Sequence, residues 1–252
     1  GLSSIEMSAT DIFVEINQAF DTSDKENDIV VDYAQQAIDV AVGVNNYMTF
    51  DMDGSRGEVL TLSANLDIAL FSFFNVSGEF SFEKSTRDIV LSDDDSSTIS
   101  VDYLSMSTSD VNGFAGLNYG TSSQSGLSLG QLSFAMALMN DKSNLSRNLI
   151  ALKADVGSAQ FTGIDGLTLS GDSLSLEINK TSLDDGLVAD FSGAYSIDFT
   201  SVTLDMDGAE GEILKISGNL NVNVFNFFSV SGGFALEKKE DQVTLSEGSV
   251  VN

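Results

Sequence analysis

Residues 205–238, DMDGAEGEILKISGNLNVNVFNFFSVSGGFALEK, repeat a stretch found earlier in the chain at residues 51–84, DMDGSRGEVLTLSANLDIALFSFFNVSGEFSFEK. The two copies are separated by a constant offset of 154 residues and are identical at 19 of 34 positions. Repetition over such a length is typical of extended arrays, although the familiar solenoid repeats are only about 20–50 residues long. We therefore expect a repeat protein.

Apolar side chains in the second copy occupy even-numbered positions from Leu214 to Leu236, whereas the odd positions are mostly Ser, Asn, Lys and Gly. A period of two predicts β-strand with one buried and one wet face. This alternation is typical of an antiparallel sheet or a solenoid wall rather than of a parallel α/β sheet. Both faces become apolar at the Phe clusters, residues 71–74 and 225–228, and we predict a bend or bulge there.

The repeat extends beyond these two stretches. Within residues 1–17, Ile5 to Asn17 match Leu167 to Asn179 at an offset of 162, and the extra residues of the first copy fall in the charged tip 21–28. Residues 29–50 correspond to 186–204, and we predict strand for 33–38 and for its counterpart 191–197.

The parity of the apolar positions switches after Phe82 and again after Leu236. A short hairpin with an even number of loop residues produces such a switch. This pattern predicts hairpin turns at Ser85-Thr86 and at Lys239-Glu240, inside charged tips.

Composition narrows the function classes. The chain contains no Cys, His, Trp or Pro, which excludes disulfides and thiolate sites and disfavours zinc, haem and iron–sulfur centres. Acidic residues outnumber basic ones by 38 to 11, a formal net charge of −27. Such acidity disfavours nucleic acid and anionic membranes, and it suits cation binding in extracellular or saline surroundings. No apolar run approaches the roughly 18 residues of a spanning helix, so we expect no membrane insertion.

The sequence also resembles a known class of repeats. The pattern TLDMDGAEGE, then SGNL-type strands, FNFFSVSGGFALEK and a VTLSEG turn, together with GLSLGQLSFAMALM, is similar to tandem repeats of giant secreted or surface-anchored bacterial proteins. These include adhesin-like chains labelled LEPR-XLL, often described as calcium-binding. The resemblance covers nearly the whole chain and implies a secreted or cell-surface location and a structural role. The calcium nonapeptide GGxGxD of many such chains is absent here.

Three carboxylates recur in both copies beside paired glycines, which gives six candidate metal ligands: Asp51, Asp53, Glu58, Asp205, Asp207 and Glu212. Hard oxygen ligands on a Gly-containing turn suit Ca²⁺, and Asp-x-Asp-Gly opens many calcium loops. The spacing does not complete an EF-hand, which places its Glu at loop position 12. The alternative is a plain acidic turn in which Asp is the cap and Gly supplies a positive φ. Calcium is the one cofactor that the sequence suggests.

Residues 171–174 spell GDSL, the nucleophile block of a lipase and esterase family that the chain otherwise does not resemble. A Ser nucleophile needs a base, normally His, and the chain has none. The block also recurs in the repeat as residues 9–12, and we interpret both as turns without catalytic residues.

We predict an all-β, elongated repeat array with mainly antiparallel strands, either solenoid-like or built from curved sheets. Residues 1–98 would be the C-terminal part of one unit and residues 99–252 one complete unit, both part of a longer protein. The expected function is a non-catalytic stalk, adhesin spacer, or filament- or sheath-forming unit, whose partners are neighbouring repeats or identical subunits joined by β-edge or end-to-end packing. The alternative is a binding module with an apolar trough, lined by the Phe clusters, for lipid or another hydrophobic ligand.

Overall fold

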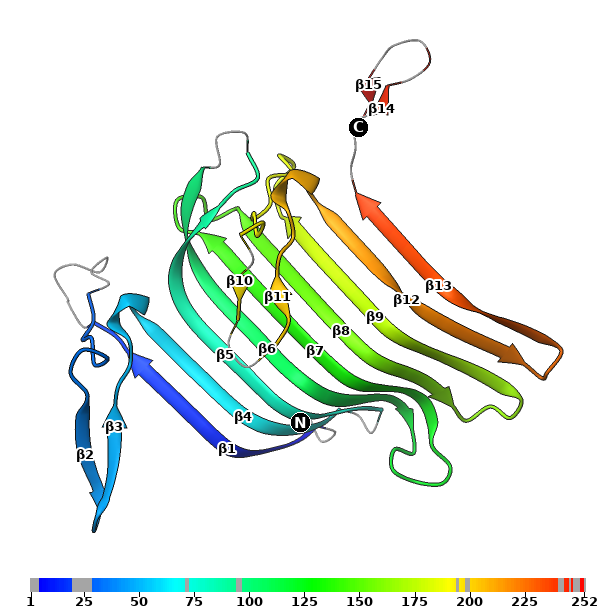
Figure 1. The fold of residues 1–252 in the computed structure, drawn as a ribbon, viewed down its shortest axis with the longest axis horizontal. Coiled ribbons are helices and arrows are strands. Elements are labelled where there is room, and N and C mark those ends of the chain that lie inside the picture. The colour runs from blue at the N-terminus through cyan, green and yellow to red at the C-terminus, as the bar shows by residue number, and fades with distance from the viewer. Residues whose placement is uncertain are drawn as a thin grey trace.

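The computed structural model of the chain describes residues 5–19, 29–70, 73–93, 97–193, 195–197, 200–239, 243–244, 246 and 250–251. Nine strands form one antiparallel sheet in the order β1-β4-β5-β6-β7-β8-β9-β12-β13 (Figure 1). They are β1 (Ile5–Asn17), β4 (Val59–Leu70), β5 (Phe74–Val90), β6 (Thr98–Leu117), β7 (Ser125–Asp141), β8 (Asn148–Thr162), β9 (Leu167–Thr181), β12 (Ile213–Val224) and β13 (Phe228–Lys239). The predicted all-β class and mainly antiparallel pairing are confirmed. The sheet is open, with β1 and β13 at its edges.

Two segments leave the sheet at the same end of their strands (Figure 1). The first insert, residues 29–58 between β1 and β4, carries β2 (Ile38–Gly43), β3 (Asn46–Phe50) and the 3-10 helix η1 (Gly54–Arg56). The second insert, residues 182–212 between β9 and β12, carries β10 (Tyr195–Ser196), β11 (Thr203–Leu204) and η2 (Gly208–Glu210). The order strand, insert, hairpin therefore occurs twice. A further small pair, β14 (Val243–Thr244) and β15 (Val250–Val251), lies outside the sheet.

The Phe cluster at 225–228 is a hairpin turn, so the prediction of a bend or bulge within a strand was wrong there. Val224 pairs with Phe228, and Phe225 and Asn226 between them adopt positive φ angles of 53° and 54°. The apolar residues change face because the chain reverses, and Phe227 projects into solvent. In the first copy, Phe73 occupies the corresponding turn, whereas residues 71 and 72 lie outside the described residues.

The predicted hairpin at Ser85-Thr86 was also wrong, because β5 continues through it to Val90. The apolar positions switch parity there because a different face of the same strand becomes buried. Phe82 lies on one face, whereas Leu91 just beyond β5 belongs to a buried core on the other. At Lys239-Glu240 only Lys239, the last residue of β13, is described.

Residues 33–36 form a turn rather than the predicted strand, and strand begins only at Ile38. In the second copy, strand is limited to Tyr195–Ser196 within the described part of 191–197. The turn is held by the carbonyl oxygen of Met52, which accepts hydrogen bonds from the N–H groups of Tyr33 and Ala34 at 3.0 and 3.1 Å. The charged tip 21–28 lies outside the described residues.

A line of β-bulges crosses the sheet. One residue in each of β1, β6, β7 and β9 adopts a left-handed conformation with φ between 51° and 56°: Asp11, Asp110, Gln131 and Ser173. Each lies at or beside a shift of strand register. The GDSL block is therefore a bulge inside β9 and not a turn, although its equivalence to residues 9–12 holds, because both blocks contain the left-handed bulge residue.

The two faces of the sheet differ in their cover. The second insert packs across one face, which we call the covered face, and buries a core there. Figure 1 shows β10 and β11 lying over β5 to β8, whereas β2 and β3 project past the edge strand β1. The opposite face, which we call the open face, has no layer over it among the described residues.

Candidate functional site: the contact between insert and sheet

The second insert and the covered face meet in the main hydrophobic core. Small side chains on the central strands, Ala135, Ala137 and Ala151, are fully buried and let the insert approach the sheet closely. The larger members of the core are Leu91, Val101, Tyr103, Met139 and Leu149 from the sheet region and Phe191, Ile197, Val202, Leu204 and Met206 from the insert. Burial of large apolar side chains contributes roughly 1.5–3 kcal/mol each, so this contact holds the insert in place.

Backbone hydrogen bonds tie the start of the second insert to the end of β5. Ala189 forms an isolated antiparallel bridge with Leu91. On either side of it, the Asp190 N–H donates to the Val90 carbonyl and the Ser92 N–H donates to the Val188 carbonyl, both at 2.9 Å. The insert that follows β9 therefore reaches back over three strands to a segment about 100 residues earlier. This contact joins the second copy of the repeat to the strands that precede it.

A buried Asn near the end of the strand holds each insert. Asn179 on β9 is fully buried, and its Nδ2 donates to the Ala189 carbonyl at 2.7 Å. Asn17 on β1 donates in the same way to the Val31 carbonyl at 2.8 Å. The same amide contact therefore occurs in both copies.

A partly buried Asp supports the short helix of each insert. Asp190 accepts hydrogen bonds from the N–H groups of Ser192 at 2.9 Å and Gly208 at 3.1 Å. Burial raises the pKa of Asp190, but these hydrogen bonds outweigh it and leave the pKa below its usual value. Asp32 accepts from the Gly54 N–H in the first copy. A side chain at either glycine would overlap the aspartate, since a Cβ would lie 2.8 Å from Asp190 Cβ or 2.6 Å from Asp32 Cβ.

The six predicted metal ligands lie at the far end of each insert, where most of them bind groups of the chain. Asp53 and Asp207 cap η1 and η2 by accepting from the Ser55 and Ala209 N–H groups at 2.8 and 2.9 Å. Glu58 and Glu212 accept from the Ala19 and Thr181 N–H groups at 2.7 and 2.9 Å. Asp205 pairs with Lys153 at 2.6 Å, and Asp51 is exposed.

These contacts match the plain-turn alternative. Within the described ranges, no group of three or more Asp or Glu side chains converges in a way that could hold a metal ion. The calcium site stays a prediction of the sequence, and nothing in the contacts requires an ion to hold these turns.

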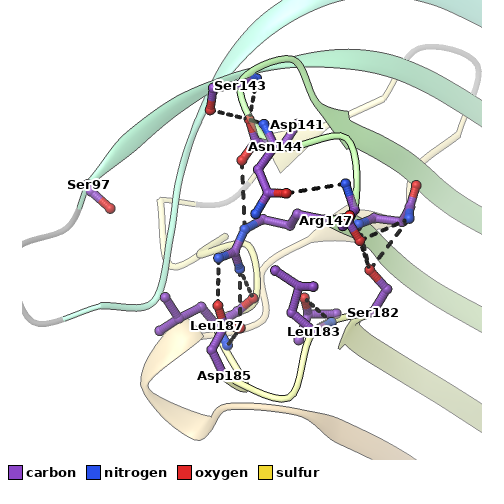
Figure 2. Close-up of polar contacts among 12 residues, drawn as sticks. Ser97, Asp141, Ser143, Asn144, Arg147, Ser182, Leu183, Asp185 and Leu187 are labelled. Carbon is purple, nitrogen blue, oxygen red and sulfur yellow. Dashed lines mark hydrogen bonds and ion pairs between the residues drawn. The ribbon is translucent and has the colours of Figure 1, made fainter.

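Ion pairs of Arg147 hold the first residues of the second insert (Figure 2). It lies in the loop between β7 and β8 and pairs with Asp185 of the insert at 2.6 Å and with Asp141 at 3.7 Å. Burial raises the pKa of Asp141, but hydrogen bonds from Ser143 and Asn144 and the Arg147 charge outweigh it and lower the pKa. This cluster, in which Arg147 and Asp141 are buried and Asp185 is exposed, fixes the point at which the chain leaves β9.

A cleft of about 540 Å³ opens between the second insert and the upper part of β5 and β6. Its floor carries Arg87, whose guanidinium lies 4.9 Å from the Tyr103 ring centre and 5.2 Å from that of Tyr195, and pairs with Glu83 at 2.6 Å. Arg56 of η1 also pairs with Glu83. Through these contacts Arg56 of the first insert and Tyr195 of the second insert are both linked to β5.

The two inserts carry equivalent contacts but differ sharply in exposure. Ile197 and Val202 of the second insert are 8% and 5% exposed. Their counterparts Ile38 and Met48 in the first insert are 47% and 57% exposed. The first insert keeps its apolar face and its Asn and Asp contacts. Apart from η1, whose Arg56 pairs with Glu83 on β5, its described residues lie beyond the edge strand β1 and cover no strands.

No protein-family model, curated protein or solved structure matches this chain. Among the residues described, no helix is long and apolar enough to span a membrane.

Sequence reasoning missed the residues that hold the inserts. Asn17 and Asn179, and likewise Asp32 and Asp190, are identical between the copies. Their identity in both copies was the signal in the sequence that could have revealed these contacts. It did not single them out, because an isolated Asn at a strand end is also typical of an ordinary turn.

Proposed function

We propose that this chain is a non-catalytic structural repeat unit of a large extracellular bacterial protein, serving as a stalk, adhesin spacer or filament-forming element. Each unit would add strands to one continuous sheet, and its insert would cover the strands of the preceding unit. The bacterial and extracellular parts of this proposal come from the sequence resemblance and from the acidic, cysteine-free composition.

The observation that carries the proposal is the difference between the two inserts. Both have the Asn and Asp contacts that position an insert, and both present apolar residues on one side. Among the described residues, only the second insert packs its apolar residues on strands of the sheet. An apolar hairpin that is held in position without a surface to cover is what a unit needs if it docks on a preceding neighbour.

The test compares the chain with a longer version in which residues 73–166 are placed before residue 5, so that copies of β5 to β8 precede β1. In this tandem chain, the first insert should cover the added strands, and Met48 should become buried. Met48→Asp should then destabilise the tandem chain by about 3 kcal/mol but leave the 252-residue chain nearly unchanged. Urea unfolding measures both effects.

The equivalent substitution in the second insert, Val202→Asp, is the positive control and should destabilise both chains. Equal, small effects of Met48→Asp in the two chains would contradict the proposal, because the first insert would then not dock on preceding strands.

A further inference from the structure

The open face of the sheet is a continuous apolar surface. One cross-strand row follows the registered pairs through eight strands from β1 to β12: Val14, Leu62, Phe82, Met106, Met136, Leu152, Ile178 and Leu214. A second row below the bulges continues the surface through Phe74, Ala115, Leu127, Phe161, Leu169, Val222 and Val230. The first row faces away from the second insert, since the core residues of the same strands, such as Val101, Ala135 and Leu149, have the opposite parity. The second row lies on the same face as the first, because the bulges shift the register between the two rows while β5 and β12 run through both without a bulge of their own.

Charge is almost absent from the open face, although the chain carries a net charge of −27. The charged side chains on this face within the described strands are Lys84, Asp88, Asp102, Lys180 and Lys238. Three are basic and two acidic, and they lie in the rows nearest the inserts and on the edge strand β13. The acidic excess therefore lies on the covered face, in the inserts and in the loops.

The open face is also large. Nine strands about 4.8 Å apart, with about 12 residues of about 3.3 Å in the shortest, give an area of about 1,500 Å². A stable protein interface needs about 800 Å² from each partner, and monomeric soluble proteins rarely expose apolar patches above about 600 Å². Side chains on the central strands are substantially exposed on this face, including Leu104 on β6 at 42% and Leu127 on β7 at 38%.

We propose that a second copy of this chain covers the open face, so that two sheets pack face to face as a sandwich with the inserts on its outer sides. An antiparallel sheet with one apolar face buries it most completely against a similar sheet. A second copy matches the face in area and in lack of charge. It also keeps the acidic surfaces of the two copies apart. This inference is independent of the proposed role of the first insert.

Analytical ultracentrifugation of the 252-residue chain tests the proposal. The native chain should sediment as a dimer at micromolar concentration. Leu104→Asp and Leu127→Asp place a charge on exposed positions of β6 and β7, where the monomer tolerates it but the interface does not, and each should weaken the dimer at least about 100-fold. Gln160→Asp, on the opposite face of β8, is the matched control and should leave the dimer intact. Circular dichroism should show unchanged strand content in all three variants.

A covalent test exploits the absence of native cysteine. β7 is the middle strand of nine, so two copies related by a two-fold axis would bring Met136 of each copy close together. Met136→Cys should form a disulfide-linked dimer under mild oxidation, whereas Gln160→Cys should not.

A native chain that stays monomeric at all concentrations would overturn the proposal, as would a dimer that survives both aspartate substitutions. If the monomer instead bound an apolar dye that fatty acid displaced, the cleft of about 750 Å³ over Leu104, Leu138 and Ile150 would be the site of a small hydrophobic ligand.

Discussion

Glycine at the bulges of the sheet has a packing role that the sequence alone does not reveal. Gly78 on β5 has φ 147°, and a Cβ there would lie 2.3 Å from Val111 Cγ1. Val111 follows the left-handed Asp110 and fills the space that the glycine leaves open. The pair Gly218 and Leu174 repeats this arrangement, with a Cβ contact of 2.5 Å.

Gly78→Ala should lower the free energy of unfolding by about 2–3 kcal/mol, because it adds both an overlap with Val111 and backbone strain. Gly232→Ala is the matched control, since Gly232 has φ 159° and a Cβ added there would meet no atom within 4 Å. That variant should lose about 1 kcal/mol or less. Urea denaturation of both variants measures the difference, and equal losses would show that strain alone accounts for the glycine.

Glu83 gives the sheet a defined pH dependence. Burial raises its pKa, but hydrogen bonds and charge from Arg87 and the charge of Arg56 outweigh this and hold the pKa below the ordinary value of 4.5. A lowered pKa in the folded state stabilises the fold above pH 4.5, and this contribution disappears as the pH falls through the folded-state pKa.

Glu83→Gln should therefore cost about 2 kcal/mol at pH 7, and its cost should shrink toward zero as the pH falls from about 5 to below the folded-state pKa. Unfolding curves for the native and variant chains across this range provide the measurement. A cost that stays constant with pH would mean that the ion pairs with Arg56 and Arg87 contribute nothing beyond packing.

At the scale of elements, the two inserts allow the same Asn contact to be compared in an insert that packs on strands and in one that does not. Asn179→Ala removes the donor to the Ala189 carbonyl beneath a packed insert and should cost about 2 kcal/mol. Asn17→Ala removes the equivalent contact to Val31 from an insert that covers no strands, and it should cost less than half as much.

Hydrogen exchange shows which part of the chain loosens when the Asn179 contact is removed. In Asn179→Ala, amides of the second insert should lose protection while those of β7 keep theirs, because the insert loosens before the sheet unfolds. Uniform loss of protection across the sheet and the insert would contradict this, since the contact would then support the sheet itself.

Strand content and antiparallel pairing could be predicted because alternation along strands is local. The turns could not be predicted equally well, since apolar residues lie on both faces of β5: Phe82 on the open face and Ile89 beside the core on the covered face. A parity switch then reflects which face is buried, not a reversal of the chain. The core contact between Ala189 and Leu91 joins segments 98 residues apart, and no local pattern encodes that pairing.

The role of the candidate metal residues could not be predicted from the sequence alone either. Their identity in the two copies was visible in the sequence, but identical carboxylates serve equally as ligands and as caps. The hydrogen bonds from Ser55 to Asp53 and from Ala209 to Asp207 became visible only once the backbone was placed.

For the whole molecule, the net charge of −27 predicts a stability that depends on ionic strength. Repulsion among the acidic side chains on the covered face, the inserts and the loops opposes the folded state, and salt screens it over a Debye length of about 10 Å at 0.1 M. Raising NaCl from 10 to 200 mM should therefore increase the melting temperature by about 5 °C.

Calorimetry in CaCl₂ and in chelator at the same ionic strength separates screening of the acidic surface from calcium binding. If Ca²⁺ raises the melting temperature beyond matched NaCl, and Asp205→Asn with Asp207→Asn abolishes the excess, the carboxylates bind calcium. An equal response to both salts means that these residues act as caps alone, and that the acidic surface needs only general screening.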